Sequence, residues 1–125
     1  MRAAHRRAAG YVLLEVLVTI LILMFGPISG AHFNPAVSLV FRLRGELSTR
    51  EFIAYVAVQI AGAVLGVWLA HAMFALPLWQ PGTHVRTGGA QWLSEGVACF
   101  GLVLTILLGL RHRAHAIPAL VASYI

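Results

Sequence analysis

The chain contains little charge and almost no cysteine. Its 125 residues are 10% charged and 60% hydrophobic, and the mean hydropathy is +0.86. Soluble domains are typically about 25% charged, so the composition excludes that class and predicts a multi-pass protein of the cell membrane. The single cysteine, Cys99, excludes an internal disulfide bond.

Lysine is absent, and all nine basic side chains are arginines. The arginines lie at the ends of apolar runs, where basic residues act as topology signals. We therefore expect the lipid bilayer as a partner and no nucleic acid. Among the six histidines, only His112 and His115 have helical spacing, and neighbouring arginines disfavour a metal ion there. The sequence predicts no metal site and no cofactor.

Long apolar runs are what the chain does have. They predict one transmembrane domain over 1–125. It begins with a spanning helix at 11–28 and a re-entrant segment at 29–44. A spanning helix at 49–76, a loop at 77–90, a spanning helix at 91–110 and the start of another helix at 117–125 follow. The basic start could resemble that of a signal peptide, but no convincing small-residue cleavage site follows it. Ser48 and Glu51 have the spacing of a capping box at the start of the second span.

The re-entrant segment contains the string Ser-Gly-Ala-His-Phe-Asn-Pro-Ala-Val, residues 29–37. Asn34 stands where a helix N-cap belongs, and Pro35 stands at the first helical position. A helix from Pro35 to Leu43 is only about 13 Å long, which is less than half of a ~30 Å hydrocarbon core. The pattern predicts a half-helix that enters the membrane and returns. The alternative is an ordinary Asn-Pro cap after a loop.

The start of such a half-helix suits a filter for uncharged solutes. Free N–H groups at a helix start carry partial positive charge, which raises the energy of a cation in the middle of a membrane. The amide of Asn34 can also donate N–H groups to a neutral solute. These properties favour water or small polyols over ions.

The same string closely resembles the first Asn-Pro-Ala box of the aquaporin (major intrinsic protein) family. Residues 57–66, with Gln59 before a glycine stripe, are similar to the third spanning helix of the family. Residues 95–100 are similar to its Glu-x-x-x-Thr-Phe element, with Cys99 in place of the threonine. The resemblance implies an all-α membrane protein, an aquaporin-like helical bundle that is partial: about three spanning helices, one half-helix and the start of a fourth span.

The resemblance also implies which residues face the pore. Those of the box are Gly30, His32, Asn34, Pro35 and Ala36. Leu14, about five to six turns before the asparagine, corresponds to a position in the selectivity ring where many strict water channels carry an aromatic residue. A leucine there predicts a wider, less polar ring that admits glycerol-like solutes. The alternative is a leucine that faces lipid or packs against a helix.

Two polar side chains and one small-residue stripe are assigned structural roles. Glu95 is expected to be a buried carboxylate that orients a re-entrant loop, with a proton relay as the alternative. Gln59 is expected to be a buried amide that holds helices together. Gly62, Gly66 and Ala70 recur at four-residue spacing, which lets membrane helices approach closely. Glu15 is assigned to the membrane interface, with a functional role as the alternative.

Family members are built from two inverted halves, and each half carries one such box. This sequence has one box and resembles the middle of a full channel. We predict an aquaporin-like channel for passive movement of water or small neutral solutes, homo-oligomeric and tetrameric by resemblance, and inactive as this chain alone unless several copies complete a pore. The alternative is a non-conducting membrane fragment or an accessory subunit of an intact channel. An enzyme is not expected, because neither Glu15 nor Glu95 has a histidine, cysteine or serine at convincing nucleophile or metal spacing.

The arginines give conflicting topology signals. In the orientation of the family, the arginines after the half-helix and those at 111–113 face the cytoplasm, as the positive-inside rule requires. The same orientation places Arg2, Arg6 and Arg7 on the opposite side. If these three residues set the orientation, the whole chain inverts.

Overall fold

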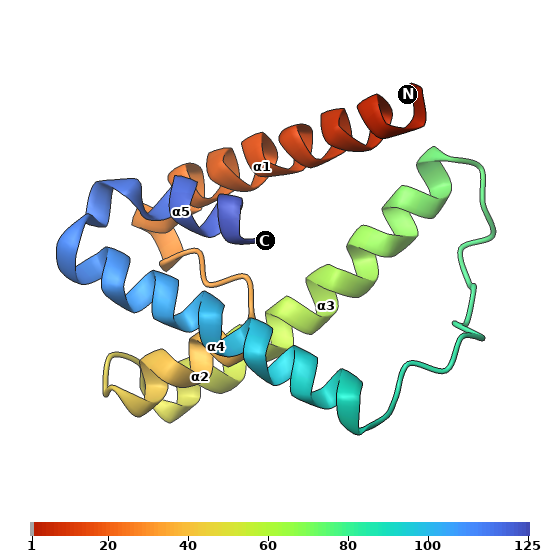
Figure 1. Cartoon of the computed structure of the whole chain (residues 1–125). Coiled ribbons are helices and arrows are strands. Elements are labelled where there is room, and N and C mark those ends of the chain that lie inside the picture. Colours follow the sequence, from red (N-terminus) through yellow and green to blue (C-terminus); the bar gives the residue numbers. More distant parts are fainter. Residues whose placement is uncertain (1) are drawn as a thin grey trace. The chain divides into compact units, whose positions relative to one another are not determined.

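The computed structural model describes residues 2–125, and it describes side chains from residue 8 onward. In these residues every regular element is a helix (Figure 1): α1 (Arg2–Ser29), α2 (Pro35–Leu43), α3 (Thr49–Met73), α4 (Gly89–His112), the 3-10 turn η1 (Ala114–Ala116) and α5 (Ile117–Tyr124). The expected all-α class is confirmed. The side chains of Arg2, Arg6 and Arg7, which bear on the orientation, lie outside the described side chains.

Three of the helices are long and apolar enough to cross a membrane. They are Ala8–Ser29 within α1, α3 and α4, with 22, 25 and 24 residues. Their side chains are mostly exposed, and α3 contains no buried residue. Uncovered apolar helices of this length are stable in hydrocarbon, because all their backbone hydrogen bonds lie within the helix. The chain is therefore a multi-pass membrane protein.

The second spanning helix ends at Met73, before the expected position 76. Ala75 adopts a left-handed conformation, with φ of 53°. The backbone N–H of Leu76 donates to the carbonyl of His71, and that of Ala75 donates to Ala72. This is the Schellman arrangement that closes a helix. Because alanine stands where such helix ends usually have glycine, the sequence does not indicate this helix end.

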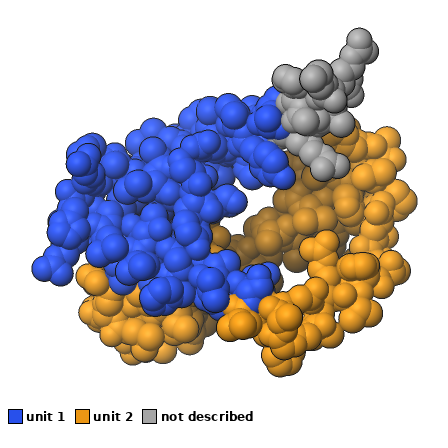
Figure 2. Space-filling view, viewed as in Figure 1, with its two compact units in different colours: residues 1–32, 94–125 blue, residues 33–93 orange. Residues whose placement is uncertain are grey.

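The chain forms two compact units (Figure 2), of which the first comprises residues 1–32 and 94–125. In this unit α5 packs against α1, and a small apolar core gathers around Ile22, Ala31 and Val121. The hydroxyl of Tyr124 donates to the carbonyl of Ala98 over 3.0 Å. A Cβ at Gly101 would lie 2.0 Å from that hydroxyl, so the close approach of Tyr124 to α4 requires glycine at this position.

The second unit, residues 33–93, contains the short helix α2 packed against α3. The connection between them carries the expected capping box. The side chain of Ser48 accepts from the backbone N–H of Glu51 over 3.2 Å, and Glu51 Oε2 accepts from the backbone N–H of Ser48 over 2.7 Å. The prediction of this box is confirmed.

Ser48→Ala is expected to lower the free energy of unfolding by about 1 kcal/mol, because the N–H of Glu51 loses its side-chain acceptor. Ser48→Asp keeps an acceptor and should cost only a few tenths of a kcal/mol. Unfolding of the protein in mixed micelles, followed by circular dichroism, measures both variants. Equal stability of Ser48→Ala and the parent chain would show that the box does not stabilise α3.

Candidate functional site

Asn34 is the N-cap of α2. Its backbone is extended, with φ of −150° and ψ of 126°, and its side-chain Oδ1 accepts from the backbone N–H groups of Ala36 and Val37, over 2.8 and 3.3 Å. Pro35 follows as the first helical residue, where its missing N–H costs nothing. The first helical hydrogen bond runs from Ser38 N to Asn34 O over 3.0 Å. The helix expected from Pro35 to Leu43 is present, and its re-entry into the membrane stays a prediction.

The first N–H groups of α2 are not free, which corrects the expectation from the sequence. Pro35 has none, and those of Ala36 and Val37 are taken by Asn34. The positive end of the helix dipole still lies at the start of α2. Two hydrogen bonds on Oδ1 also fix the orientation of the amide, so its Nδ2 is directed away from the helix. The site therefore presents the two N–H donors of a pinned, half-buried asparagine.

The residues before Asn34 hold an unusual backbone. Gly30, Ala31 and Phe33 all have positive φ, of 78°, 48° and 47°. Glycine tolerates this conformation, but it costs about 1–2 kcal/mol at each of the other two residues. Two strained residues within four positions indicate that the surrounding structure imposes this path, as is common at functional sites. A Cβ at Gly30 would lie 3.2 Å from Nε2 of His32, so the imidazole ring lies close against Gly30.

Contacts with α1 anchor the beginning of this loop. The N–H of Gly30 donates to the carbonyl of Gly26 over 2.8 Å. The N–H of Ala31 donates to Ser29 Oγ over 3.4 Å. The methyl group of Ala31 is buried beside Ile22 of α1. These contacts restrict the path by which the chain leaves the first spanning helix.

Ser38 and Gln59 connect α2 to α3. Ser38 is fully buried, and Gln59 Nε2 donates to Ser38 Oγ over 3.1 Å. The other end of the amide, Gln59 Oε1, is buried without a hydrogen-bond partner among the described residues. Leaving a buried acceptor unpaired costs about 1–3 kcal/mol. The contact agrees with a packing role for Gln59, and the sequence did not indicate Ser38 as its partner.

The remaining predicted residues lie outside the Asn-Pro-Ala box and are exposed in the described part of the chain. Leu14 is 47% exposed on α1, and Glu95 is exposed on α4. The small-residue stripe on α3, Gly62, Gly66 and Ala70, is also exposed. A Cβ at either glycine would meet no atom within 4 Å. Their roles in a selectivity ring, in burial of a carboxylate and in helix packing require protein surface beyond these residues and stay predictions.

Glu15 has a partner that sequence reasoning missed. Its Oε1 accepts a hydrogen bond from Ser123 Oγ of α5, 108 positions along the chain, and Glu15 itself is half-buried. No local pattern signals a contact over this separation. Within the described residues, no group of three or more histidine, cysteine, aspartate or glutamate side chains could hold a metal ion.

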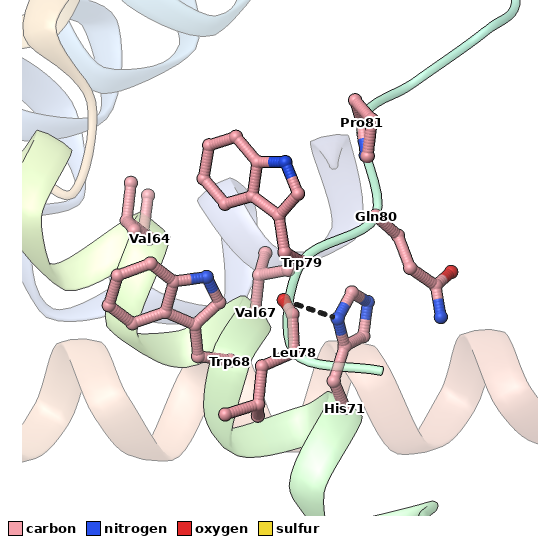
Figure 3. A pocket seen from close by; sticks show the side chains of 9 residues that line it. Val64, Val67, Trp68, His71, Leu78, Trp79, Gln80 and Pro81 are labelled. Atoms are coloured by element: carbon pink, nitrogen blue, oxygen red, sulfur yellow. Dashed lines mark hydrogen bonds between the residues drawn. The ribbon is translucent and has the colours of Figure 1, made fainter. Parts of the chain in front are cut away.

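A cavity of about 320 Å³ lies between the end of α3 and the following loop (Figure 3). The rings of Trp68 and Trp79 contribute to its lining, together with Val64 and Leu78. His71 Nδ1 shares a hydrogen bond with the carbonyl of Leu78 over 3.2 Å. The lining is mainly apolar and includes none of the predicted pore residues, so the cavity is separate from the Asn34 site.

Comparison with known proteins gives a consistent result. Residues 7–121 match the family model "Major intrinsic protein". The chain is 59% identical over 122 residues to an aquaglyceroporin, AqpS, of Rhizobium meliloti, which covers 98% of this chain and 50% of that protein. It is 33% identical to a glycerol uptake facilitator protein of Streptococcus pneumoniae, over 76% of this chain and 46% of that one.

A plant relative, aquaporin NIP1-1 of Zea mays, is 44% identical over 72% of this chain and 29% of its own length. The chain thus spans half or less of the length of these curated relatives. No solved structure matches it. The resemblance carried by the Asn-Pro-Ala box is confirmed along nearly the whole chain, which belongs to the major intrinsic protein family.

Proposed function

We propose that this chain supplies one half of an aquaporin-type pore, through which water and small uncharged solutes such as glycerol move passively. The observation that carries the proposal is the pinned amide of Asn34 at the start of a half-length helix in a membrane chain. The chain is similar to an aquaglyceroporin and to glycerol uptake facilitators, which supports the same class of solute. Membership of this family of channels agrees with the expectation that the protein is not an enzyme.

The amide of Asn34 would act as a donor to the oxygen of a passing solute. Its two N–H groups can replace part of the hydration that water or a polyol loses on entering the membrane. A cation gains nothing from these donors, and the positive end of α2 repels it. Neutral molecules that accept hydrogen bonds are therefore favoured, and no covalent step is needed.

A complete pore of this kind needs a second half. The family pore joins two half-helices from inverted repeats, and this chain contains one box. Further protein would supply the other half, within a homo-oligomer that is tetrameric by family resemblance. The alternative is an accessory subunit that docks on an intact channel. The exposed stripe on α3 favours a chain that packs against further protein in either case.

Osmotic swelling of vesicles containing this chain tests the proposal. We expect glycerol to enter these vesicles faster than it enters empty vesicles. Sorbitol, a larger polyol, serves as the external osmolyte. Leu14→Phe should slow glycerol more than water, because the added ring narrows the opening at that position. Swelling no faster than in empty vesicles, with insertion shown by protease protection, would contradict the channel and favour the accessory subunit. An equal effect of Leu14→Phe on glycerol and on water would show that Leu14 does not belong to the selectivity ring.

A further inference from the structure

The cavity between α3 and the following loop has no acidic residue, lysine or arginine in its lining. Its helix wall consists of Ala63, Val64, Val67, Trp68 and His71, and residues 78–81 form its loop wall. The lining therefore offers no carboxylate to a cation and no guanidinium or ammonium group to an anion. It favours a ligand that is mainly apolar.

The helix wall spans the depth of one leaflet of the membrane. Its members are spaced by one or three positions, which places them on one face of α3 over a length of about 12 Å. The midpoint of α3 is Ala61, so with the helix centred in the bilayer Ala63 lies about 3 Å from the middle and His71 about 15 Å. The hydrocarbon core extends about 15 Å on either side of its middle. The wall thus covers the depth of one lipid acyl chain.

The polar groups of the loop wall lie at the edge of this leaflet. His71 Nδ1 shares a hydrogen bond with the carbonyl of Leu78 over 3.2 Å, which holds the loop beside the end of α3 (Figure 3). Trp79 and Gln80 follow directly, and at this level their side-chain N–H groups can donate to the ester oxygens of a lipid. The loop after α3 contains Arg86 and no acidic residue, so it does not repel a lipid phosphate. The lining is apolar toward the middle of the membrane and polar at its edge, as a phospholipid is.

The inner part of the cavity suits neither water nor an empty space. Val64 and Val67, which line it, are 43% and 52% exposed, so the cavity is open to its surroundings. Water needs polar partners, which the side chains from Ala63 to Val67 do not provide. An empty cavity of about 320 Å³ would leave the atoms of its lining without dispersion contacts. Hydrocarbon is therefore the favoured occupant at this depth.

A second helix is less suited to this face of α3 than a flexible chain is. Small residues let membrane helices approach closely, and those of α3 are Gly62, Gly66 and Ala70. That stripe is centred about a third of the way round the helix from the cavity wall. The wall itself carries the large ring of Trp68. Packing of another helix on the stripe would leave the cavity open to lipid.

We propose that this cavity binds one acyl chain of a phospholipid. The chain lies between α3 and the loop, and its ester oxygens lie beside Trp79. The volume of about 320 Å³ is at the lower end of the range of roughly 300–1,000 Å³ for ligand sites, which suits a single chain. The bound lipid would hold the loop against the end of α3. The proposal does not rest on the proposed channel, because the cavity contains no residue of the Asn-Pro-Ala box.

Photolabelling with a phospholipid tests the proposal. The full chain is reconstituted in phosphatidylglycerol vesicles that include the same lipid with a diazirine in one acyl chain. It is then extracted into a detergent that removes loosely bound lipid, and irradiated. Mass spectrometry of the peptides should locate the attached lipid mainly on residues 63–81. Label spread over all three spans, or no retained lipid, would overturn the proposal.

Two pairs of variants connect the label to the cavity. Val64→Trp fills the cavity and should abolish lipid retention, whereas Leu65→Trp adds the same ring outside the lining and should preserve it. Trp79→Ala removes a ring from the loop wall and should also lose the lipid. Trp92→Ala removes an exposed ring that does not line the cavity and should keep it. Circular dichroism checks the fold, and the loop-wall pair decides if Val64→Trp does not fold. Equal retention within the pair of folded variants would contradict the proposal.

Native mass spectrometry distinguishes a lipid from a second copy of the chain. One phosphatidylglycerol mass on each chain, lost in Val64→Trp, supports the proposal. A lipid-free dimer that Val64→Trp dissociates and Leu65→Trp does not would assign the cavity to a second copy and overturn it. Glycerol swelling of the same vesicles separates this inference from the proposed function. Bound lipid without swelling would keep the lipid site and reject the channel, and swelling without bound lipid would do the reverse.

Discussion

Asn34→Asp is expected to abolish most solute flux while α2 stays folded. Aspartate caps helices as well as asparagine does, so its carboxylate can still accept from the N–H groups of Ala36 and Val37. The ionised side chain has no N–H to donate. A solute oxygen left without these donors costs about 1–3 kcal/mol at the site, or roughly a 5- to 140-fold slower flux. Stopped-flow swelling with glycerol measures the rate.

Two controls separate the loss of the donor from other effects. Asn34→Ser also keeps the cap, is uncharged and retains one hydroxyl donor, so its flux should lie between those of the parent chain and Asn34→Asp. Hydrogen exchange of residues 35–43 reports whether α2 remains formed in both variants. Unchanged flux in Asn34→Asp with α2 intact would show that solute does not pass the amide.

Ser38→Val is expected to detach the half-helix from α3. The substitution adds a second branch to a fully buried side chain, and overpacking of this kind costs about 1–3 kcal/mol. It also removes the hydroxyl that accepts from Gln59 Nε2, which leaves both ends of that amide unpaired at a further cost of about 1–3 kcal/mol. Amide hydrogen exchange over residues 35–43 should become faster, and the flux should fall with it.

The contribution of the hydrogen bond can be separated from that of volume. Ser38→Ala removes the acceptor without adding atoms and should therefore have a smaller effect than Ser38→Val. Gln59→Met, combined with Ser38→Ala, removes both unpaired polar atoms and should recover part of the stability, because an apolar pair leaves nothing unsatisfied. If Gln59→Met makes Ser38→Ala worse, the amide must stabilise the helix pair through other contacts.

Local signals in the chain were sufficient for the centre of the site. The cap of α2 and the capping box of α3 each depend on residues no more than three positions apart. Such contacts depend on short-range backbone geometry, so the spacing of residue types predicts them. The end of α3 is equally local, but it was misplaced because Ala75, rather than glycine, takes the left-handed conformation.

The sequence by itself determined the membrane class, the three spans, the family and the position of the half-helix. Only the tertiary structure decided that Ser38 meets Gln59 and that Ser123 meets Glu15. It also showed Glu95 and the α3 stripe exposed in the single chain. The physical reason is range. Hydropathy and caps act within one helix. The partner of a buried polar group depends instead on how separate helices pack. The helices here have apolar surfaces of similar composition, and such surfaces do not determine which faces meet.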